Sequence, residues 1–226
     1  MASEIFNRYG RRALLALGLA ALMAGCAERP APRISGLPDR VELTAVPFYR
    51  GEADAGAPTA LAALLRQRGV SVTPGMVASE LKTEAPGSAL EESITEAARR
   101  YGFMVYPMED QFQALLAEVA AGNPVLVRYR SGGVLWGSQR YALLVGYDRF
   151  KSLVMLRSGE KRREPLAFSD FISAWRQEGA WAVLVQPPGQ LPARVDEARW
   201  RQAAARLGRA GQEDAARQAL AALAKR

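Results

Sequence analysis

The commonest catalytic base of hydrolases is absent from this sequence, and the thiol nucleophile is nearly absent. It contains no histidine, and its one cysteine is Cys26. A cysteine or serine nucleophile needs a base within hydrogen-bond reach, and that base is most often histidine. The composition therefore excludes cysteine–histidine and serine–histidine catalysis in residues 27–226. It also removes the usual zinc ligand sets, and we expect no metal and no cofactor. A serine–lysine pair, such as Ser158 with Lys161, remains open, although its spacing does not favour it.

The segment from residue 46 to residue 65 has the layout of a nucleophile region. A short apolar run at 46–49 is expected to form a strand, and a loop of small and acidic residues follows it. Pro58 then opens a helix expected over about 58–67, because proline suits the first turn of a helix. In thiol proteases the nucleophile lies where such a loop enters a helix. There the positive end of the helix dipole lowers the thiol pKa and helps to hold an oxyanion.

This segment resembles the nucleophile region of the C39-like cysteine peptidases of the papain-like group. The closer resemblance is to the bacterial lipoprotein branch that carries a C-terminal tetratricopeptide-like (TPR-like) segment. The family motif is Val-Pro-Phe, a glutamine, four residues, and then Cys-Gly-Pro-x-Ala-Leu. Here Gly51 stands at the glutamine position and Gly56 at the cysteine position, whereas residues 58, 60 and 61 match. The packing residues of the motif are kept and its chemical residues are not.

Two later stretches extend the resemblance over about residues 46–188. The family has His-Tyr-Ala-x-x-x-Gly-Tyr-Asp, with the histidine as general base, and residues 140–148 read Arg-Tyr-Ala-Leu-Leu-Val-Gly-Tyr-Asp. Arg140 thus takes the histidine position. The residue that orients the histidine falls near Ser158, by a looser match. The resemblance implies a papain-like α+β domain that is catalytically inactive, a pseudoenzyme with degenerate positions at Gly51, Gly56, Arg140 and Ser158.

The periodicity of the apolar residues agrees with that fold class. Helices precede a mostly β region, which is an α+β layout with a mainly antiparallel sheet. Thr73 is expected to cap one helix, residues 88–91 read as a capping box for the next, and Ser169 is expected to cap a short one. A continuous apolar run at 141–147 predicts a central strand. The remaining expected elements are helices at 74–81, 88–101, 112–121 and 169–175, and strands at 103–106, 124–129, 153–156, 162–166 and 181–185.

Residues 1–25 have the organisation of a lipoprotein signal peptide. Three arginines precede an apolar run at 13–25 that is shorter than the roughly 20 residues needed to span a bilayer. The run ends Leu-Met-Ala-Gly-Cys, which resembles a lipobox, so we expect Cys26 to carry the lipid, including palmitate. The alternative is an uncleaved anchor with an incidental cysteine. By resemblance to Gram-negative lipoproteins, Ala27 favours the periplasmic face of the outer membrane.

Residues 26–44 are expected to form a tether, because prolines and a glycine interrupt regular structure there. A peptidase-like domain is expected over 45–188, and a hinge at 188–192 leads to two helices in 193–226. These helices resemble one tetratricopeptide repeat, which buries too little surface to be stable alone. The helical hairpin therefore either docks on its own domain or binds a partner. The expected apolar positions are Trp200, Ala203, Ala204 and Leu207 in the first helix, and Ala216, Ala219, Leu220 and Leu223 in the second.

The charge pattern bears on the class of partner. The formal charge is +7, but the sequence has no basic stripe with interleaved aromatic residues, so we expect no nucleic-acid binding. We expect instead a lipid-anchored pseudo-peptidase that binds a peptide or protein partner, with Arg140 and Trp136 at the vacated cleft. For these two residues the alternatives are an ion pair of Arg140 with a carboxylate such as Asp54, and packing of Trp136 on the sheet. The competing functions are an active hydrolase of unrecognised mechanism and a structural envelope component.

Overall fold

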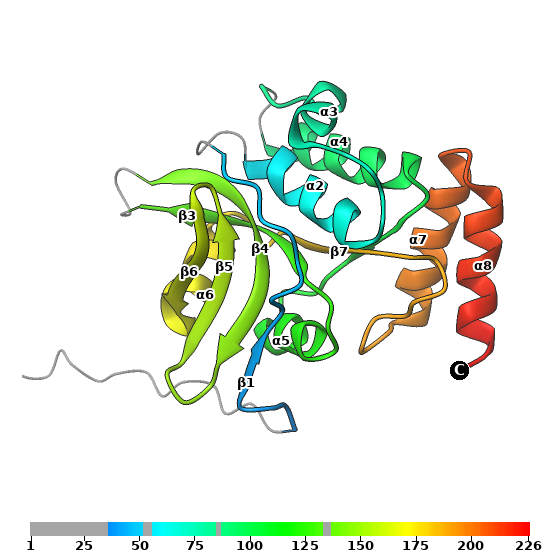
Figure 1. The fold of residues 1–226 in the computed structure, drawn as a ribbon. Helices are drawn as coiled ribbons and strands as arrows, with labels where there is room; N and C mark the ends of the chain where they lie inside the picture. Colours follow the sequence, from blue (N-terminus) through cyan, green and yellow to red (C-terminus); the bar gives the residue numbers. More distant parts are fainter. Residues whose placement is uncertain (1–35, 52–55, 85–86, 133–136) are drawn as a thin grey trace, which may run out of the picture. The chain divides into compact units, whose positions relative to one another are not determined.

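A seven-stranded antiparallel sheet lies between two groups of helices in the computed structural model of the chain (Figure 1). The structure describes residues 36–51, 56–84, 87–132 and 137–226. The strands are β1 (Arg40–Glu42), β2 (Met104–Pro107), β3 (Val125–Ser131), β4 (Ser138–Asp148), β5 (Leu153–Ser158), β6 (Lys161–Ala167) and β7 (Ala182–Gln186). The helices are α2 (Gly56–Gln67), α3 (Pro74–Glu80), α4 (Gly87–Arg100), α5 (Phe112–Ala120), α6 (Phe168–Gln177), α7 (Glu197–Arg209) and α8 (Glu213–Ala224).

The sheet has the order β2-β7-β3-β4-β5-β6, and β1 pairs with β4 as well. The long strand β4 is central, as its apolar run predicts. Its first part, residues 138–144, pairs with β3, and its last part, residues 146–148, pairs with β1. β5 pairs with residues 143–148 of β4, with an irregularity in the register between Leu144 and Gly146. The predicted α+β fold class with a mainly antiparallel sheet is therefore confirmed.

The two faces of the sheet support two apolar layers, because successive side chains of a strand point to opposite faces. Leu126 of β3 packs in the layer formed with α2, α3 and α4. Its neighbour Val127 packs in the other layer, with α5, α6, α7 and α8. The helix α2 is the most deeply placed of the described helices, since residues 56–65 are all buried.

The segment before α2 differs from the sequence-based expectation. Residues 46–49 form no strand, and α2 begins at Gly56, two residues before Pro58. The predicted tether is wrong at its C-terminal end, because residues 40–42 pair with β4 as β1. The bidentate contact from Arg163 of β6 to Glu42, with N···O distances of 2.6 and 2.8 Å, helps to hold β1 in place. Short strands of this kind depend on tertiary pairing, which local composition does not reveal.

Two capping predictions are also wrong. The helix α4 begins at Gly87, so Ser88 lies inside it, and the carboxylate of Glu91 forms an ion pair with Arg128 at 2.7 Å. The helix α6 begins at Phe168 with Ala167 as its N-cap, which places Ser169 within the first turn. By contrast, Thr73 caps α3 as expected, and its hydroxyl accepts a hydrogen bond from the backbone N–H of Met76.

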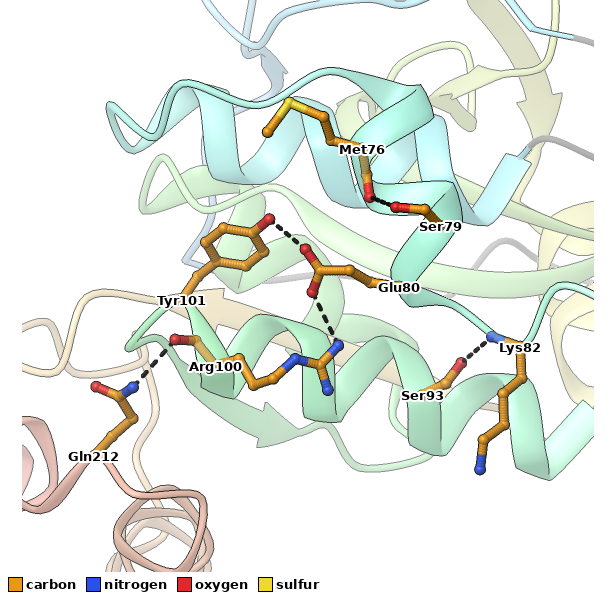
Figure 2. Close-up of polar contacts among 8 residues, drawn as sticks. All are labelled: Met76, Ser79, Glu80, Lys82, Ser93, Arg100, Tyr101 and Gln212. Atoms are coloured by element: carbon orange, nitrogen blue, oxygen red, sulfur yellow. Dashed lines mark hydrogen bonds and ion pairs between the residues drawn. The ribbon is translucent and has the colours of Figure 1, made fainter.

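The C-terminal hairpin, α7 and α8, packs against the rest of the domain. Trp200 is fully buried, and its indole N–H donates to the backbone oxygen of Ala219 at 2.8 Å. Its ring lies 6.1 Å from the ring of Tyr106 in β2, between centroids. At the turn between the two helices, the side-chain amide of Gln212 donates to the backbone oxygen of Arg100 in α4 (Figure 2). Leu220, expected on the buried face of α8, is instead 44% exposed.

Candidate functional site

Four positions singled out in the sequence lie around the junction of α2, β4 and the β5–β6 turn. The backbone N–H of Gly51 donates to the oxygen of Gly159, which follows Ser158 in that turn, at 3.3 Å. A Cβ atom placed on Gly159 would lie 3.6 Å from the guanidinium of Arg140, and one placed on Gly56 would lie 3.4 Å from the amide nitrogen of Tyr141. Segments about 90 residues apart in the chain thus meet at one place.

The N-terminus of α2 leaves no room for a side chain at Gly56. A Cβ atom there would lie 2.8 Å from the backbone oxygen of Tyr141, well inside ordinary van der Waals contact. The obstacle is the backbone of the central strand β4, which cannot rotate away as a flexible side chain can. The first turn is further fixed by the buried hydroxyl of Thr59, which donates to the oxygen of Gly56 at 3.1 Å. Any side chain at this helix N-terminus therefore requires α2 or β4 to shift.

Ser158 is buried and belongs to a hydrogen-bonded network that reaches the surface at Lys161. Its hydroxyl lies 2.8 Å from the hydroxyl of Tyr129, which donates to Glu164 at 3.0 Å. The ammonium group of Lys161 contacts the other carboxylate oxygen of Glu164 at 2.9 Å. Burial is the main cause that raises the pKa of Tyr129 to about 12. Tyr129 is therefore protonated at neutral pH and is a poor base for Ser158.

Arg140 lies directly opposite Tyr129 in the β3–β4 register and is half-buried. Its Nε atom is buried and has no hydrogen-bond partner among the described residues, and none of the ion pairs in the described part of the chain involves it. The suggested partner Asp54 lies outside the described residues, as does Trp136. The positive charge of Arg140 opposes the rise in the pKa of Tyr129, although burial prevails.

The space beside these residues is small. A cavity of about 10 Å³ is lined by Tyr49, Thr59, Leu143, Ser158 and Gly159, among others. One water molecule needs at least about this much volume, so a peptide side chain does not fit there as the described residues stand. The guanidinium of Arg140 donates hydrogen bonds but offers no proton acceptor. Among the described residues no group of three or more metal-ligating side chains could hold a metal ion.

Several buried polar residues of this region did not emerge from the sequence. Tyr129 and Glu164 form the network around Ser158, and Arg157 is 7% exposed with its guanidinium donating to the backbone oxygens of Leu43 and Thr44 at 3.1 and 3.2 Å. A charged residue within a strand is the one available signal. It does not reveal which carbonyl or carboxylate will meet the charge. The strand pairing decides that.

Comparisons with known proteins identify the architecture. A family model of the peptidase C39-like family matches residues 44–183. A protein from Bacillus anthracis described as a C39-like peptidase is similar with a TM-score of 0.52 and 19% identity, over 66% of this chain and 98% of that one. The peptidase domain of Streptococcus ComA, a bifunctional ABC transporter involved in a quorum sensing pathway, gives 0.50 and 17%, over 62% and 96%. Xylellain, a cysteine protease from Xylella fastidiosa, gives 0.50 and 12%, over 68% and 87%.

None of the curated proteins matches the chain. At identities of 12–19%, the likeness to solved structures establishes the fold and leaves the chemistry to the residues themselves. The matched residues 44–183 end within β7, so the hairpin of α7 and α8 lies outside the family region.

Proposed function

The chain belongs to the peptidase C39-like family, and we propose that it is a catalytically inactive member that binds a peptide or protein partner at the bacterial cell envelope. The observation that carries this proposal is the close approach of β4 to α2. A side chain at Gly56 would meet the oxygen of Tyr141 at 2.8 Å, so no nucleophile fits at that helix N-terminus. The absence of histidine from the whole sequence supports the same conclusion.

The remaining groups do not replace the missing chemistry. Arg140 stands at the general-base position suggested by the sequence motif, but a guanidinium neither accepts a proton at neutral pH nor returns one to a leaving amine. Gly51 has no side chain with which to stabilise an oxyanion, a contribution typically worth about 3 kcal/mol. The nucleophile, the general base and the side chain that stabilises the oxyanion in a cysteine peptidase site are thus all missing.

An active serine–lysine hydrolase is the competing proposal, and the contacts disfavour it. A serine–lysine pair needs the amine beside the hydroxyl. Here the ammonium of Lys161 pairs with Glu164, and the hydroxyl of Ser158 pairs with Tyr129. The side chain of Lys161 is also 67% exposed, so its amine lacks the desolvation that activates a catalytic lysine.

The envelope location rests on the N-terminal sequence. The proposed lipid on Cys26 would anchor the chain at the periplasmic face of the outer membrane, with part of residues 27–39 as a tether. No helix in the described ranges is long and apolar enough to cross a membrane. A structural envelope component would share this anchor, but it would bind no peptide.

The experiment that tests this proposal combines an assay for turnover with a search for a ligand. The full chain, purified in detergent, is incubated with a fluorogenic peptide library and is separately photo-crosslinked in intact envelopes. We expect no turnover and at least one specific crosslinked peptide or protein. Turnover that survives repurification and is abolished by Ser158→Ala would overturn the loss of catalysis, and absence of any specific crosslink would favour the structural role.

A further inference from the structure

A large hollow of the described surface lies away from the converged positions, between α4 and the C-terminal end of α7. Its volume is about 800 Å³, against about 10 Å³ for the cavity beside Ser158. It runs across the end of the sheet where β2 lies, and Val105, Trp181 and Val183 contribute to its apolar part. We call this hollow the α4–α7 groove. Ligand pockets commonly have volumes of about 300–1,000 Å³, so the groove is large enough for a segment of several residues.

Three arginines of two different helices gather along this groove. Arg99 comes from α4, and Arg206 and Arg209 come from α7. Arg99 is half-buried, its Nε atom is buried without a hydrogen-bond partner in the described structure, and its terminal nitrogen donates only to Thr95, at 3.3 Å. Burial first and the charge of Arg206 next lower the pKa of Arg99. The three guanidinium groups thus repel one another at a place where burial already disfavours charge.

No carboxylate forms an ion pair with this cluster within the described chain. The arginines of α4 and α7 that form ion pairs are Arg100, Arg199 and Arg201, not the three arginines of the groove. Glu92 and Glu96 line the groove on α4 and support the charge of Arg99 from a distance, but neither forms an ion pair with it. The lining of the groove therefore carries the glutamates Glu91, Glu92 and Glu96 together with three arginines that form no ion pair within the described chain.

Both walls of the groove are held in place by contacts at its two ends. At one end, Glu91 of α4 forms an ion pair with Arg128 at 2.7 Å, and the Nε atom of Arg128 donates to the backbone oxygen of Glu178 at 3.0 Å. At the other end, Gln212 fixes the α7–α8 turn to α4 at 3.1 Å, and Glu80 of α3 accepts from Tyr101 at 2.6 Å (Figure 2). A groove with fixed walls needs little reorganisation when a ligand binds.

We infer that the α4–α7 groove binds an extended peptide segment that bears a carboxylate. Arg99, Arg206 and Arg209 bind the carboxylate. The apolar side chains of the peptide contact Val105 and Trp181. Guanidinium groups suit carboxylates because they donate two parallel hydrogen bonds. The glutamates of the groove disfavour a polyanion such as a nucleic acid, whereas a peptide with one carboxylate and neutral or basic neighbours suits both the arginines and the glutamates. This inference rests on the proposed binding function and places it in a site built partly by α7, outside the matched residues 44–183.

The test uses the full chain in detergent and an array of random octapeptides, each made with a free carboxyl end and as its amide. We expect the enriched sequences to carry a carboxylate. Apart from that group, we expect little excess of basic or acidic residues in them. We further expect Arg206→Glu with Arg209→Glu to weaken binding at least about tenfold, which is the loss of one good charge-assisted contact. The matched control is Arg201→Glu, which changes another exposed arginine of α7 that pairs with Glu197 outside the groove. Melting curves check that each variant is folded.

The outcomes separate this inference from the proposed function. Peptide binding that is unchanged by the double substitution would overturn the groove as the site and leave the binding function standing. Equal enrichment of acids and amides that lack acidic side chains would overturn the carboxylate preference. Inorganic sulfate that competes as well as the peptide does, at equal concentration, would show an anion site without peptide recognition. No binding by any peptide, together with no crosslinking in envelopes, would count against both.

Discussion

The backbone oxygen of Tyr141 lies 2.8 Å from the position that a Cβ atom on Gly56 would take. This close approach joins the N-terminus of the buried helix α2 to the central strand β4, and it excludes a side chain at the helix end where a thiol would be activated. The packing of α2 against β4 in this chain therefore favours glycine at position 56. Arg140 precedes Tyr141 in β4, so the strand that crowds Gly56 also carries the residue that the sequence motif aligns with the general base of the family.

Gly56→Ala is expected to lower the free energy of unfolding by about 1–3 kcal/mol, the usual cost of overpacking a core. The reason is that the new methyl group meets a backbone oxygen, so β4 or α2 must shift. Chemical denaturation of the purified protein measures the change. The control is Gly75→Ala in α3, where the nearest atom is the Thr73 hydroxyl at 4.0 Å. That substitution is expected to be neutral or stabilising by up to about 1 kcal/mol, because alanine favours helices. Equal effects of the two changes would contradict the packing argument.

Restoring the family side chains is expected to yield no peptidase. In the triple variant Gly51→Gln, Gly56→Cys and Arg140→His, the new cysteine meets the same oxygen of Tyr141. Its thiol can be directed at a substrate only if the backbone of β4 moves. Fluorogenic peptide hydrolysis and iodoacetamide labelling of a Cys26→Ser background check the outcome. Hydrolysis at a rate that depends on residue 56 would show that the site opens more readily than the structure indicates.

We expect the hairpin of α7 and α8 to stay packed on the domain and to stabilise it through Trp200. Trp200→Ala should cost about 3–5 kcal/mol, because it empties a buried site and removes the hydrogen bond to Ala219. Leu220→Ala in α8 is the control, since Leu220 is 44% exposed, and it should change stability by less than about 0.5 kcal/mol. If both substitutions leave the melting temperature unchanged while partner binding is lost, the hairpin acts as an interaction arm that docks only weakly.

Much of the fold follows from the pattern of apolar residues. The central run at 141–147 and the helix over 58–67 both have unbroken hydrophobic surfaces, and both form as predicted within two or three residues. The wrong predictions fall where tertiary contacts decide the local structure. β1 exists because β4 offers it a free edge and Arg163 offers Glu42 a bidentate partner. Ser88 is no cap, because Glu91 pairs with Arg128 across the fold instead of closing the first turn.

The sequence predicts which positions form the candidate site, but it does not predict how closely their backbones and side chains pack. Motif spacing brought Gly51, Gly56, Arg140 and Ser158 into one region, and the structure places them around one junction. The sequence gives no sign that β4 approaches α2 so closely, because the distance between two backbone segments cannot be read from residue types. It also gives no sign of the arginines of the α4–α7 groove, which come from helices about 100 residues apart in the chain.

Cys26 is expected to carry the lipid. The basis is a short apolar run that ends Ala-Gly-Cys, a spacing that suits signal-peptide cleavage before a cysteine. Cells fed with radiolabelled palmitate should label the wild-type chain and leave Cys26→Ser unlabelled, and fractionation should place the labelled chain in the outer membrane. Equal labelling of both forms would refute the lipid anchor at this residue.

Glu118 is expected to make stability fall as the pH rises. Its side chain is 1% exposed, and burial raises its pKa despite hydrogen bonds from Asn123 and the backbone N–H of Ala193. The folded state therefore holds this proton more tightly than the unfolded state does. As the pH rises from the ordinary value of 4.5 through the raised pKa, the folded state loses that advantage. The free energy of unfolding of the wild type, minus that of Glu118→Gln, should decrease across this window.

The matched control is Glu80→Gln, for which the opposite sign is expected. Burial alone would raise the pKa of Glu80, but hydrogen bonds from Tyr101 and Arg100 outweigh it and lower the pKa (Figure 2). Its contribution is therefore present above the ordinary value of 4.5 and is lost as the pH falls through the lowered pKa. Melting temperatures of the wild type and both variants from acidic to neutral pH test the pair. Parallel curves for the wild type and Glu118→Gln would mean that Glu118 keeps an ordinary pKa, and that its hydrogen bonds offset its burial.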